Sequence, residues 1–148
     1  MNDRYLYRAK RKDNGEWIVG SLIQTSYLGS IRSWISSEQE DKARLREISS
    51  NQAVWRAFEV RTDTICQYTG LTDKNGNKIW ENDICRRVLL PTKRIKTNFK
   101  IAYVPYKCCI SAIDLDGSNI TFLSDYINNQ YEVEVIGNIF DNQELLEK

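Results

Sequence analysis

The chain has 148 residues, enough for one domain with its own core, and its 41% hydrophobic and 28% charged residues are ordinary for a globular protein. A formal net charge of +1 gives no overall attraction to nucleic acid or to acidic membranes. No apolar run approaches the roughly 20 residues of a membrane span, and the opening MNDRYLYRAKRKDNG holds no signal-peptide core, so we expect a soluble, cytoplasmic protein without membrane contact.

The first predicted element is a hairpin in YLYRAKRKDNGEWIVGSLI, residues 5–23. Asn14 and Gly15 lie at its centre, and such a pair is typical of a tight hairpin turn because both residues tolerate positive φ. The apolar residues spaced two apart around this turn are Tyr5, Tyr7, Ala9, Trp17, Val19 and, past Gly20, Leu22. The pattern predicts two paired strands with Trp17 substantially buried.

The segment SSEQEDKARLREI, residues 36–48, departs from this alternation. Ser36 or Ser37 can cap a helix there, and opposite charges recur at i,i+4, as in Glu38 and Lys42. Because the segment has few apolar residues, we expect either a surface helix or a mobile excursion.

A second hairpin is predicted in QYTGLTDKNGNKIWENDIC, residues 67–85, with Gly76 at its turn and Trp80 buried soon after it. A calcium-binding loop could have a similar composition, but it needs an oxygen ligand five residues before the glycine. This chain has Leu71 there, which excludes calcium.

Glu81 and Asp83, directly after that hairpin, form a candidate catalytic pair, because alternate residues of an extended segment face the same way. However, no nucleophile–base set, phosphate loop or metalloprotease motif accompanies them. We therefore favour a second tight turn after Trp80, in which Asn82 and Asp83 bond to the backbone before a strand begins at Ile84.

A third hairpin is predicted in IDLDGSNITFL, residues 113–123, about Asp116 and Gly117, with Ile120 and Phe122 on the return strand. Alternation predicts further strands at residues 57–60, 84–90, 99–104 and 131–139. The many short strands at close spacing predict a mainly β protein, a small antiparallel barrel or sandwich built from hairpins.

The last predicted strand, residues 131–139, changes its apolar phase next to Gly137, as a β-bulge would cause. The following residues, FDNQELLEK, place Asp141 and Glu144 in the spacing of a capped helix start. We expect one or two helical turns there, which completes a single domain over residues 1–148.

Residues that carry chemistry are few. The chain has no histidine, which removes the commonest metal ligand and the usual general base. Its cysteines, Cys66, Cys85, Cys108 and Cys109, match no Cys-x-x-Cys spacing of a zinc or redox site, and we expect them to fill space in the core. We therefore expect no metal, no cofactor and no catalytic residue.

Residues 67–84 closely resemble the core motif of the YopX family, small proteins of temperate phages and prophages. The family pattern is Gln-Tyr-Thr-Gly-Leu, an Asp-Lys-Asn-Gly turn, an apolar pair and Glu-Gly-Asp-Ile. The matching residues are Gln67, Tyr68, Thr69, Gly70, Leu71, Asp73, Lys74, Asn75, Gly76, Glu81, Asp83 and Ile84. Asn82 stands where the family usually has glycine, and asparagine tolerates the same left-handed conformation.

The resemblance extends to both ends of the chain. YRAKRKDNGEWIVGSLI is similar to the family's opening hairpin, and YEVEVIGNIFDNQELLE resembles its closing EVIGNIYENPELL pattern, with Gln143 where proline is common. Residues 24–56 and 86–130 would then be variable insertions. The resemblance implies a β-rich phage or prophage protein in the cytoplasm of a bacterial host, and it brings no activity, cofactor or catalytic residue with it.

Charge is unevenly distributed, because residues 86–113 hold basic but no acidic side chains, whereas the charged residues of 114–148 are all acidic except Lys148. The basic residues are Arg86, Arg87, Lys93, Arg94, Lys96, Lys100 and Lys107. Residues 86–107, which we call the basic segment, combine these cations with Phe99, Tyr103 and Tyr106, a composition that suits phosphate contacts and base stacking. The segment is therefore a candidate nucleic-acid site, with the first six of these basic residues as the candidate contacts. The other interpretation, which we favour, is that it pairs with the acidic C-terminal region of its own or a neighbouring molecule.

Three functions follow from these patterns. The favoured one is a non-enzymatic phage accessory protein, a β module that binds a host or phage macromolecule, or assembles with itself, through exposed strand edges. Nucleic-acid binding by the basic segment is the alternative. An enzyme that uses Glu81 and Asp83 is the least favoured of the three.

Overall fold

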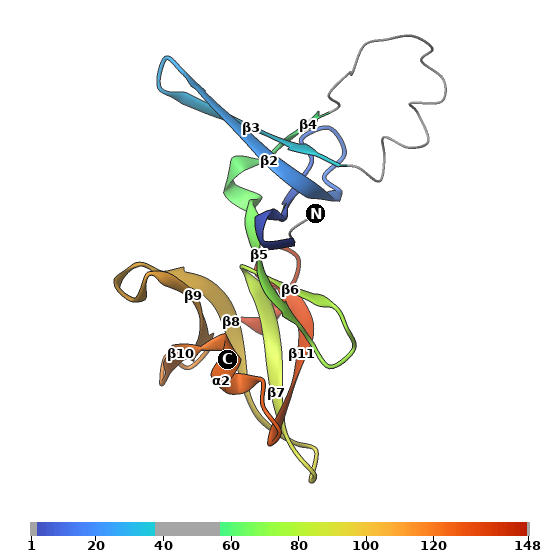
Figure 1. The fold of residues 1–148 in the computed structure, drawn as a ribbon, viewed down its shortest axis with the longest axis vertical. Coiled ribbons are helices and arrows are strands. Elements are labelled where there is room, and N and C mark those ends of the chain that lie inside the picture. The colour runs from blue at the N-terminus through green and yellow to red at the C-terminus, as the bar shows by residue number, and fades with distance from the viewer. Residues whose placement is uncertain (1–2, 38–56, 148) are drawn as a thin grey trace. The chain divides into compact units, whose positions relative to one another are not determined.

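In the computed structural model of the chain, residues 3–37 and 57–147 are described, and they form strands joined by tight turns (Figure 1). The chain divides into two compact units, residues 1–67 and residues 68–148. Every strand pairing between described residues is antiparallel, so the prediction of a mainly β fold is confirmed. The single domain expected over residues 1–148 stays a prediction.

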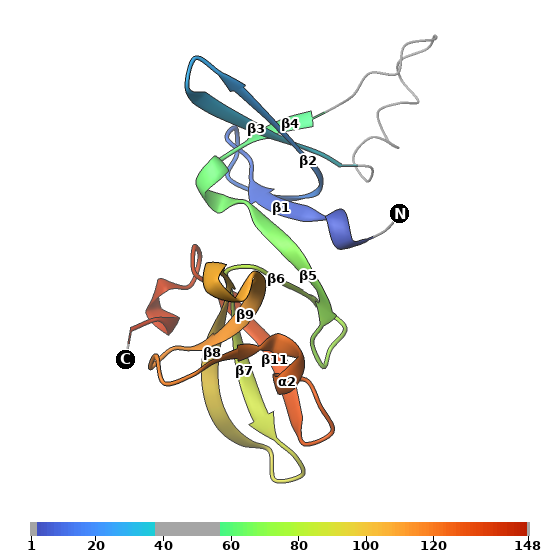
Figure 2. The same cartoon turned by 60° about the vertical axis from the view of Figure 1, so that its left-hand side comes forward.

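The first unit is a sheet of hairpins (Figure 2). Its elements are η1 (Asp3–Tyr5), β1 (Tyr7–Lys10), β2 (Trp17–Tyr27), β3 (Ser30–Ser36), β4 (Ala57–Val60), η2 (Thr62–Thr64) and the start of β5 (Cys66–Thr72). β2 pairs with β1 at residues 17–20 and with β3 at residues 21–27. Ser36, expected to cap a helix, ends β3 instead, and the rest of that predicted helix, residues 38–48, lies outside the described residues.

The inner face of the first hairpin has the opposite phase to the one predicted for β2. Ala9 lies opposite Ile18, and both are buried, whereas Val19 is 41% exposed and Trp17 is half-buried. The core of this unit is Ala9, Ile18, Ile35 and Val60. Ile18 therefore takes the inner-face position on β2, and Trp17, predicted to be substantially buried, is of intermediate exposure.

The cause of this phase is the close approach of β3 at Gly20. A Cβ atom built on Gly20 would lie 1.9 Å from the carbonyl oxygen of Ser36, so only glycine fits on the inner face there. Alternation then directs Trp17 to the opposite face. Its ring lies 4.7 Å from the guanidinium carbon of Arg8 and 5.5 Å from the Lys10 ammonium nitrogen, as cation–π contacts.

The second unit holds a five-stranded sheet and one short α-helix. Its elements are the end of β5, β6 (Lys78–Trp80), β7 (Asp83–Leu89), β8 (Arg94–Val104), η3 (Pro105–Lys107), β9 (Cys109–Asp114), β10 (Ile120–Phe122), α2 (Leu123–Tyr126), β11 (Tyr131–Asn138) and η4 (Gln143–Leu145). The sheet has the order β10-β9-β8-β7-β11, and the other sheet has the order β4-β3-β2-β1-β5-β6. In residues 3–37 and 57–147 neither sheet closes on itself, which excludes the closed barrel, one of the two predicted arrangements.

The three hairpin turns predicted from the sequence are confirmed. Gly15, Gly76 and Gly117 have φ of +74°, +81° and +74°, and each lies between two paired strands, as predicted. The bulge is also confirmed, because the register of β11 against β7 shifts between Val135 and Gly137. A Cβ atom at Gly137 would lie 2.5 Å from the side-chain oxygen of Asn142, so a larger residue there would require the Asn142 side chain to move.

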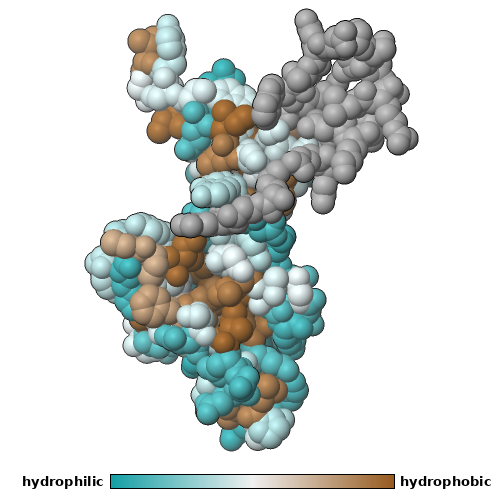
Figure 3. Space-filling view, in the orientation of Figure 1, coloured by the Kyte–Doolittle hydropathy of each residue, from teal (hydrophilic) through white to brown (hydrophobic). Residues whose placement is uncertain are grey.

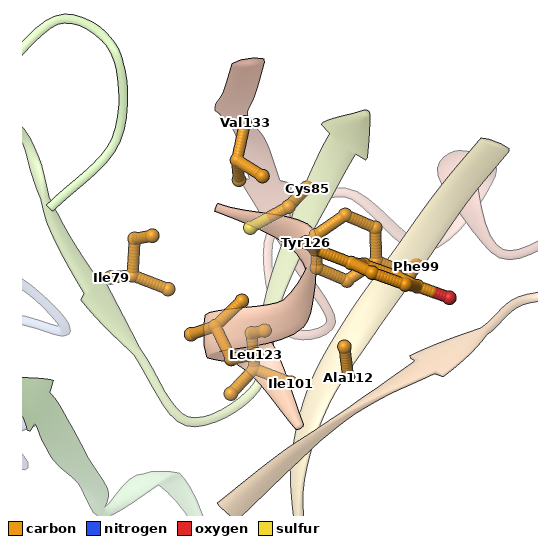
Figure 4. Packing of buried hydrophobic residues seen from close by; sticks show 8 residues of the cluster. All are labelled: Ile79, Cys85, Phe99, Ile101, Ala112, Leu123, Tyr126 and Val133. Atoms are coloured by element: carbon orange, nitrogen blue, oxygen red, sulfur yellow. The ribbon is translucent and has the colours of Figure 1, made fainter. Parts of the chain in front are cut away.

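The core of the second unit lies between the sheet and α2 (Figure 4). Its buried members are Ile79, Cys85, Phe99, Ile101, Ala112, Leu123, Tyr126 and Val133. The rings of Phe99 and Tyr126 meet edge to face with centroids 4.9 Å apart, and the Tyr126 hydroxyl donates to the Asp114 carboxylate at 2.8 Å. Burial, together with that hydrogen bond, raises the pKa of Tyr126.

Residues 86–130, expected to be a variable insertion, supply β8, β9, β10 and α2 and thus much of this core. Two cysteines behave as predicted, because Cys66 and Cys85 are buried. The prediction is wrong for Cys108, which is exposed in the turn after η3 with a φ of 53°.

The C-terminal helical turn is confirmed as η4, but its predicted cap does not form. Asn142 is the residue before η4, and Asp141 instead accepts a hydrogen bond from the Asn138 side-chain amide at 3.1 Å. Glu144 accepts from the Asn142 side chain at 3.3 Å. Asn138 folds the chain back here, because its side-chain oxygen accepts from the backbone N–H of Phe140 and of Asp141.

Candidate functional site

The first turn of the family motif is organised by the carboxylate of Asp73, which is only 7% exposed. It accepts the backbone N–H groups of Asn75 and Asn77, each at 2.9 Å, and the side-chain amide of Asn77 at 3.2 Å. It also accepts the backbone N–H of Val135, on β11, at 3.1 Å. One side chain therefore shapes the turn and fixes it to the last strand.

The neighbouring residue strengthens this attachment. The backbone N–H of Lys74 donates to the carbonyl of Val133 at 2.9 Å, and its ammonium lies 3.3 Å from the Glu134 carboxylate. Burial works to raise the pKa of Asp73, but the hydrogen bonds from Val135, Asn77 and the other turn donors outweigh it and lower that pKa below its ordinary value. The Asp73 carboxylate is thus held in its ionised form.

The second turn forms after Trp80, and Asp83 makes its predicted side-chain bond to the backbone. Asn82 has a φ of +65°, and the buried carboxylate of Asp83 accepts the backbone N–H of Trp80 at 2.8 Å. The N–H of Asn82 donates to the carbonyl of Ile101 at 2.8 Å, and its carbonyl accepts from Ile139 at 3.0 Å. This turn therefore links β8 to the segment after β11.

Other motif residues hold the same hairpin together. Thr69 donates its hydroxyl to the carbonyl of Ile79 at 2.7 Å, and Gly70 has a φ of +86° where the register of β5 against β6 shifts. The rings of Tyr68 and Trp80 lie with centroids 5.4 Å apart, and Trp80 is 6% exposed, which confirms its predicted burial. The motif forms a structural frame.

One of the two candidate catalytic carboxylates, that of Asp83, is part of this structural frame. Asp83 is 1% exposed and bonds to the Trp80 backbone, whereas Glu81 is half-buried. Within residues 3–37 and 57–147, no three Cys, Asp or Glu side chains gather closely enough to hold a metal ion. None of the helices in this part of the chain has the length and apolar character that a membrane crossing requires.

The six residues proposed for nucleic acid do not share one face. Arg86 and Arg87 are neighbours on β7 and point to opposite faces of the sheet. Lys100 shares the face of Arg86, because Arg86 lies opposite Asn98, two residues from Lys100. The Arg87 guanidinium carbon lies 4.0 Å from the Tyr126 ring centroid and 4.8 Å from that of Tyr131, against the core.

The remaining three lie at or near the β7–β8 turn. Lys93 forms an ion pair with Glu132 of β11 at 2.7 Å, and this pairing lowers the pKa of Glu132. Arg94 is exposed at the start of β8, and Lys96 lies on the same strand. For Lys93, pairing with the acidic C-terminal region of the same molecule, one form of the favoured interpretation, is thus observed.

The aromatic residues of the basic segment divide in the same way. Phe99 is fully buried in the core, so the hypothesis that it stacks on a base is wrong. Tyr103 and Tyr106 are 53% and 74% exposed. The segment therefore offers two exposed tyrosines and dispersed cations.

A different surface is formed by residues 21–32, which we call the arm. It comprises the end of β2, a turn at Leu28 and Gly29, and the start of β3. Tyr27, Leu28 and Ile31 are 77%, 88% and 60% exposed. Figure 3 shows hydrophobic side chains at the tip of this hairpin.

Both edges of the arm are open in the part of the chain that the structure describes. β1 pairs with β2 only at residues 17–20, and β4 pairs with β3 only at residues 33–36. Residues 17–31 carry no charged side chain. At the base of the arm, Arg32 forms a two-pronged ion pair with Glu59, which also contacts Lys12 at 2.8 Å.

The sequence patterns did not reveal the arm. Its turn, Leu28 at a φ of 48° followed by Gly29 at 78°, has no asparagine or aspartate, and leucine rarely adopts positive φ. The available signal was the uncharged alternation on both sides of Gly29.

No curated protein sequence matches the chain. The family model for the YopX protein matches residues 6–147, which cover both units and include β1, the two turns and β11. The chain therefore belongs to the YopX family.

Proposed function

We propose that this YopX-family member is a non-enzymatic accessory protein of a phage or prophage, and that it acts in the bacterial cytoplasm as a protein-binding module. The observation that carries the proposal is the arm, whose tip exposes Tyr27, Leu28 and Ile31. Its partner is a phage or host protein, or a second copy of the chain.

The exposure of these apolar side chains supports the proposal. A patch of large apolar side chains exposed to solvent is typical of a surface that binds another molecule. Open strand edges are usually protected by lysine, proline or a bulge, since they would otherwise pair with other chains. The edge of β2 at residues 21–27 has no such protection, which favours a role in binding.

The other two candidate functions have weaker support. An enzyme would use Glu81 and Asp83 as a pair, and the Asp83 carboxylate is buried and accepts the backbone N–H of Trp80. Nucleic-acid binding would need a shared basic face, and Arg86 and Arg87 lie on opposite faces.

Capture from a nuclease-treated extract of cells that carry the phage tests the proposal. Wild-type protein should retain a partner that Leu28→Asn loses, because asparagine fits the turn but removes the apolar tip. Tyr106→Ser, at a similarly exposed aromatic residue of the second unit, is the matched control and should retain the partner. Capture that nuclease abolishes, or that Leu28→Asn leaves unchanged, would contradict the proposal.

A further inference from the structure

We infer that a second copy of this chain occupies the open edge of β2 at residues 21–27, as an antiparallel strand pair about a two-fold axis. This inference rests on the proposed function, in which the arm is the binding element. It names the arm's partner and the manner of contact.

The backbone of this edge has the geometry of a strand-addition site. In an antiparallel ladder, alternate residues direct their N–H and C=O groups toward one neighbour and the others toward the opposite side. β2 pairs with β3 on one side throughout residues 21–27, and no described strand pairs on the other side. Outward N–H and C=O groups therefore remain for an added extended strand.

Charge favours a second copy as that strand. Two molecules related by a two-fold axis place the residue at the axis opposite its own copy and the residues beside it close to theirs, so a charge there would face a like charge. Residues 17–31 are uncharged in a chain where 28% of residues are charged. Arg32, the next residue along the chain, forms an ion pair with Glu59. The edge can thus meet its own copy without repulsion.

Side-chain pattern fits the same arrangement. An axis through Gln24 places Ile23 opposite Thr25 of the second copy and Tyr27 opposite Ser21. Tyr27 and Ile23 then become diagonal neighbours across the pair, within reach of an aromatic ring. Tyr27 and Ile23 are 77% and 39% exposed in a single molecule, so pairing removes apolar surface from contact with water.

The size of the contact predicts its strength. A strand pair of seven residues buries less than the roughly 1,200 Å² of total surface typical of stable complexes. The dimer should therefore be reversible and depend on concentration.

Sedimentation velocity from about 1 µM to about 1 mM tests this. Wild-type protein should shift from monomer to dimer, and Gln24→Lys and Gln24→Glu should each raise the dimer dissociation constant by about tenfold or more through like-charge repulsion. An equal mixture of the two variants should recover the dimer. Gln130→Lys, at an exposed glutamine of the second unit, should behave as wild type, and circular-dichroism melting confirms that each variant is folded.

A monomer at every concentration would overturn the inference, as would a dimer that neither Gln24 substitution weakens or a mixture that does not recover. If the dimer is absent but capture from the extract still depends on Leu28, the second-copy inference fails and the protein-binding proposal stands. If both results are negative, the proposed function fails as well.

Discussion

The carboxylate of Asp73 accepts the backbone N–H of Val135 across 62 residues of sequence, at 3.1 Å. It thereby joins the central motif of the YopX family to the family's closing strand. The same carboxylate accepts two N–H groups within its own turn. This single buried side chain explains why the motif requires an aspartate without invoking catalysis.

Asp73→Ala should lower the free energy of unfolding by about 3 kcal/mol, because several buried N–H groups lose their acceptor. Urea unfolding followed by tryptophan fluorescence measures this. Asp116→Ala is the matched control, since Asp116 organises an exposed turn and accepts the N–H of Ser118. Equal losses of unfolding free energy in the two variants would show that the burial of Asp73 does not increase its contribution to stability.

Stability should also fall in acid through Asp73. Its folded-state pKa lies below the ordinary value of 3.8, so the unfolded chain binds its proton first as pH decreases. The contribution of Asp73 is fully present above that value and is lost as pH falls below it. Unfolding measured from about pH 5 to about pH 2 should show a smaller loss for Asp73→Asn than for wild type. If the free energy of unfolding decreased equally with pH in Asp73→Asn and in wild type, the folded protein would not hold Asp73 as an ionised, hydrogen-bonded carboxylate.

Substitution of Asp83 should lower the free energy of unfolding more than substitution of Glu81, and neither residue should support catalytic turnover. Asp83→Ala leaves the buried N–H of Trp80 without this acceptor and should cost about 2 kcal/mol, whereas Glu81→Ala should cost less than about 1 kcal/mol. A substrate screen that found an activity lost in Glu81→Ala at unchanged stability would contradict the structural role of this turn.

Leu28→Asn should stabilise the first unit by roughly 0.5–1 kcal/mol, because asparagine tolerates the positive φ that strains leucine. Thermal unfolding gives the comparison, with Ile31→Ser as a variant that removes exposed apolar surface without a change of turn. If Leu28→Asn were neutral or destabilising, leucine would not be strained there.

Nucleic-acid binding should be weak. With Arg87 against the core and Lys93 paired to Glu132, titration with labelled single- and double-stranded DNA at about 150 mM salt should give no micromolar affinity. Tighter binding that weakens on removal of Arg94 and Lys100 together, and whose salt dependence flattens by about one unit per lost contact, would support the alternative function.

Local chemistry was predictable from sequence and long-range contacts were not. The turns at Gly76 and Asn82 follow from residues that tolerate positive φ, and the bulge at Gly137 follows from the change of apolar phase beside it. The phase of β2 did not follow, because it depends on how closely Ser36 approaches Gly20.

The candidate sites divide similarly. A basic run in sequence looks continuous, but alternation along β7 and the register shift between β7 and β8 distribute its side chains over two faces. The arm was not predictable because its turn has leucine at a positive-φ position, and leucine is not a turn-forming residue. The partners of Asp73 could not be found either, since Val135 contributes a backbone group that no side-chain pattern reveals.

The most direct test of the arm as the binding element is a residue-resolved one. Nitrogen-15-labelled protein can be observed by NMR in a nuclease-treated, unlabelled extract of cells that carry the phage. Binding through the arm predicts that backbone signals of residues 21–32 shift or broaden while those of residues 86–107 stay unchanged. Signals that change only in residues 86–107, or nowhere, would contradict it.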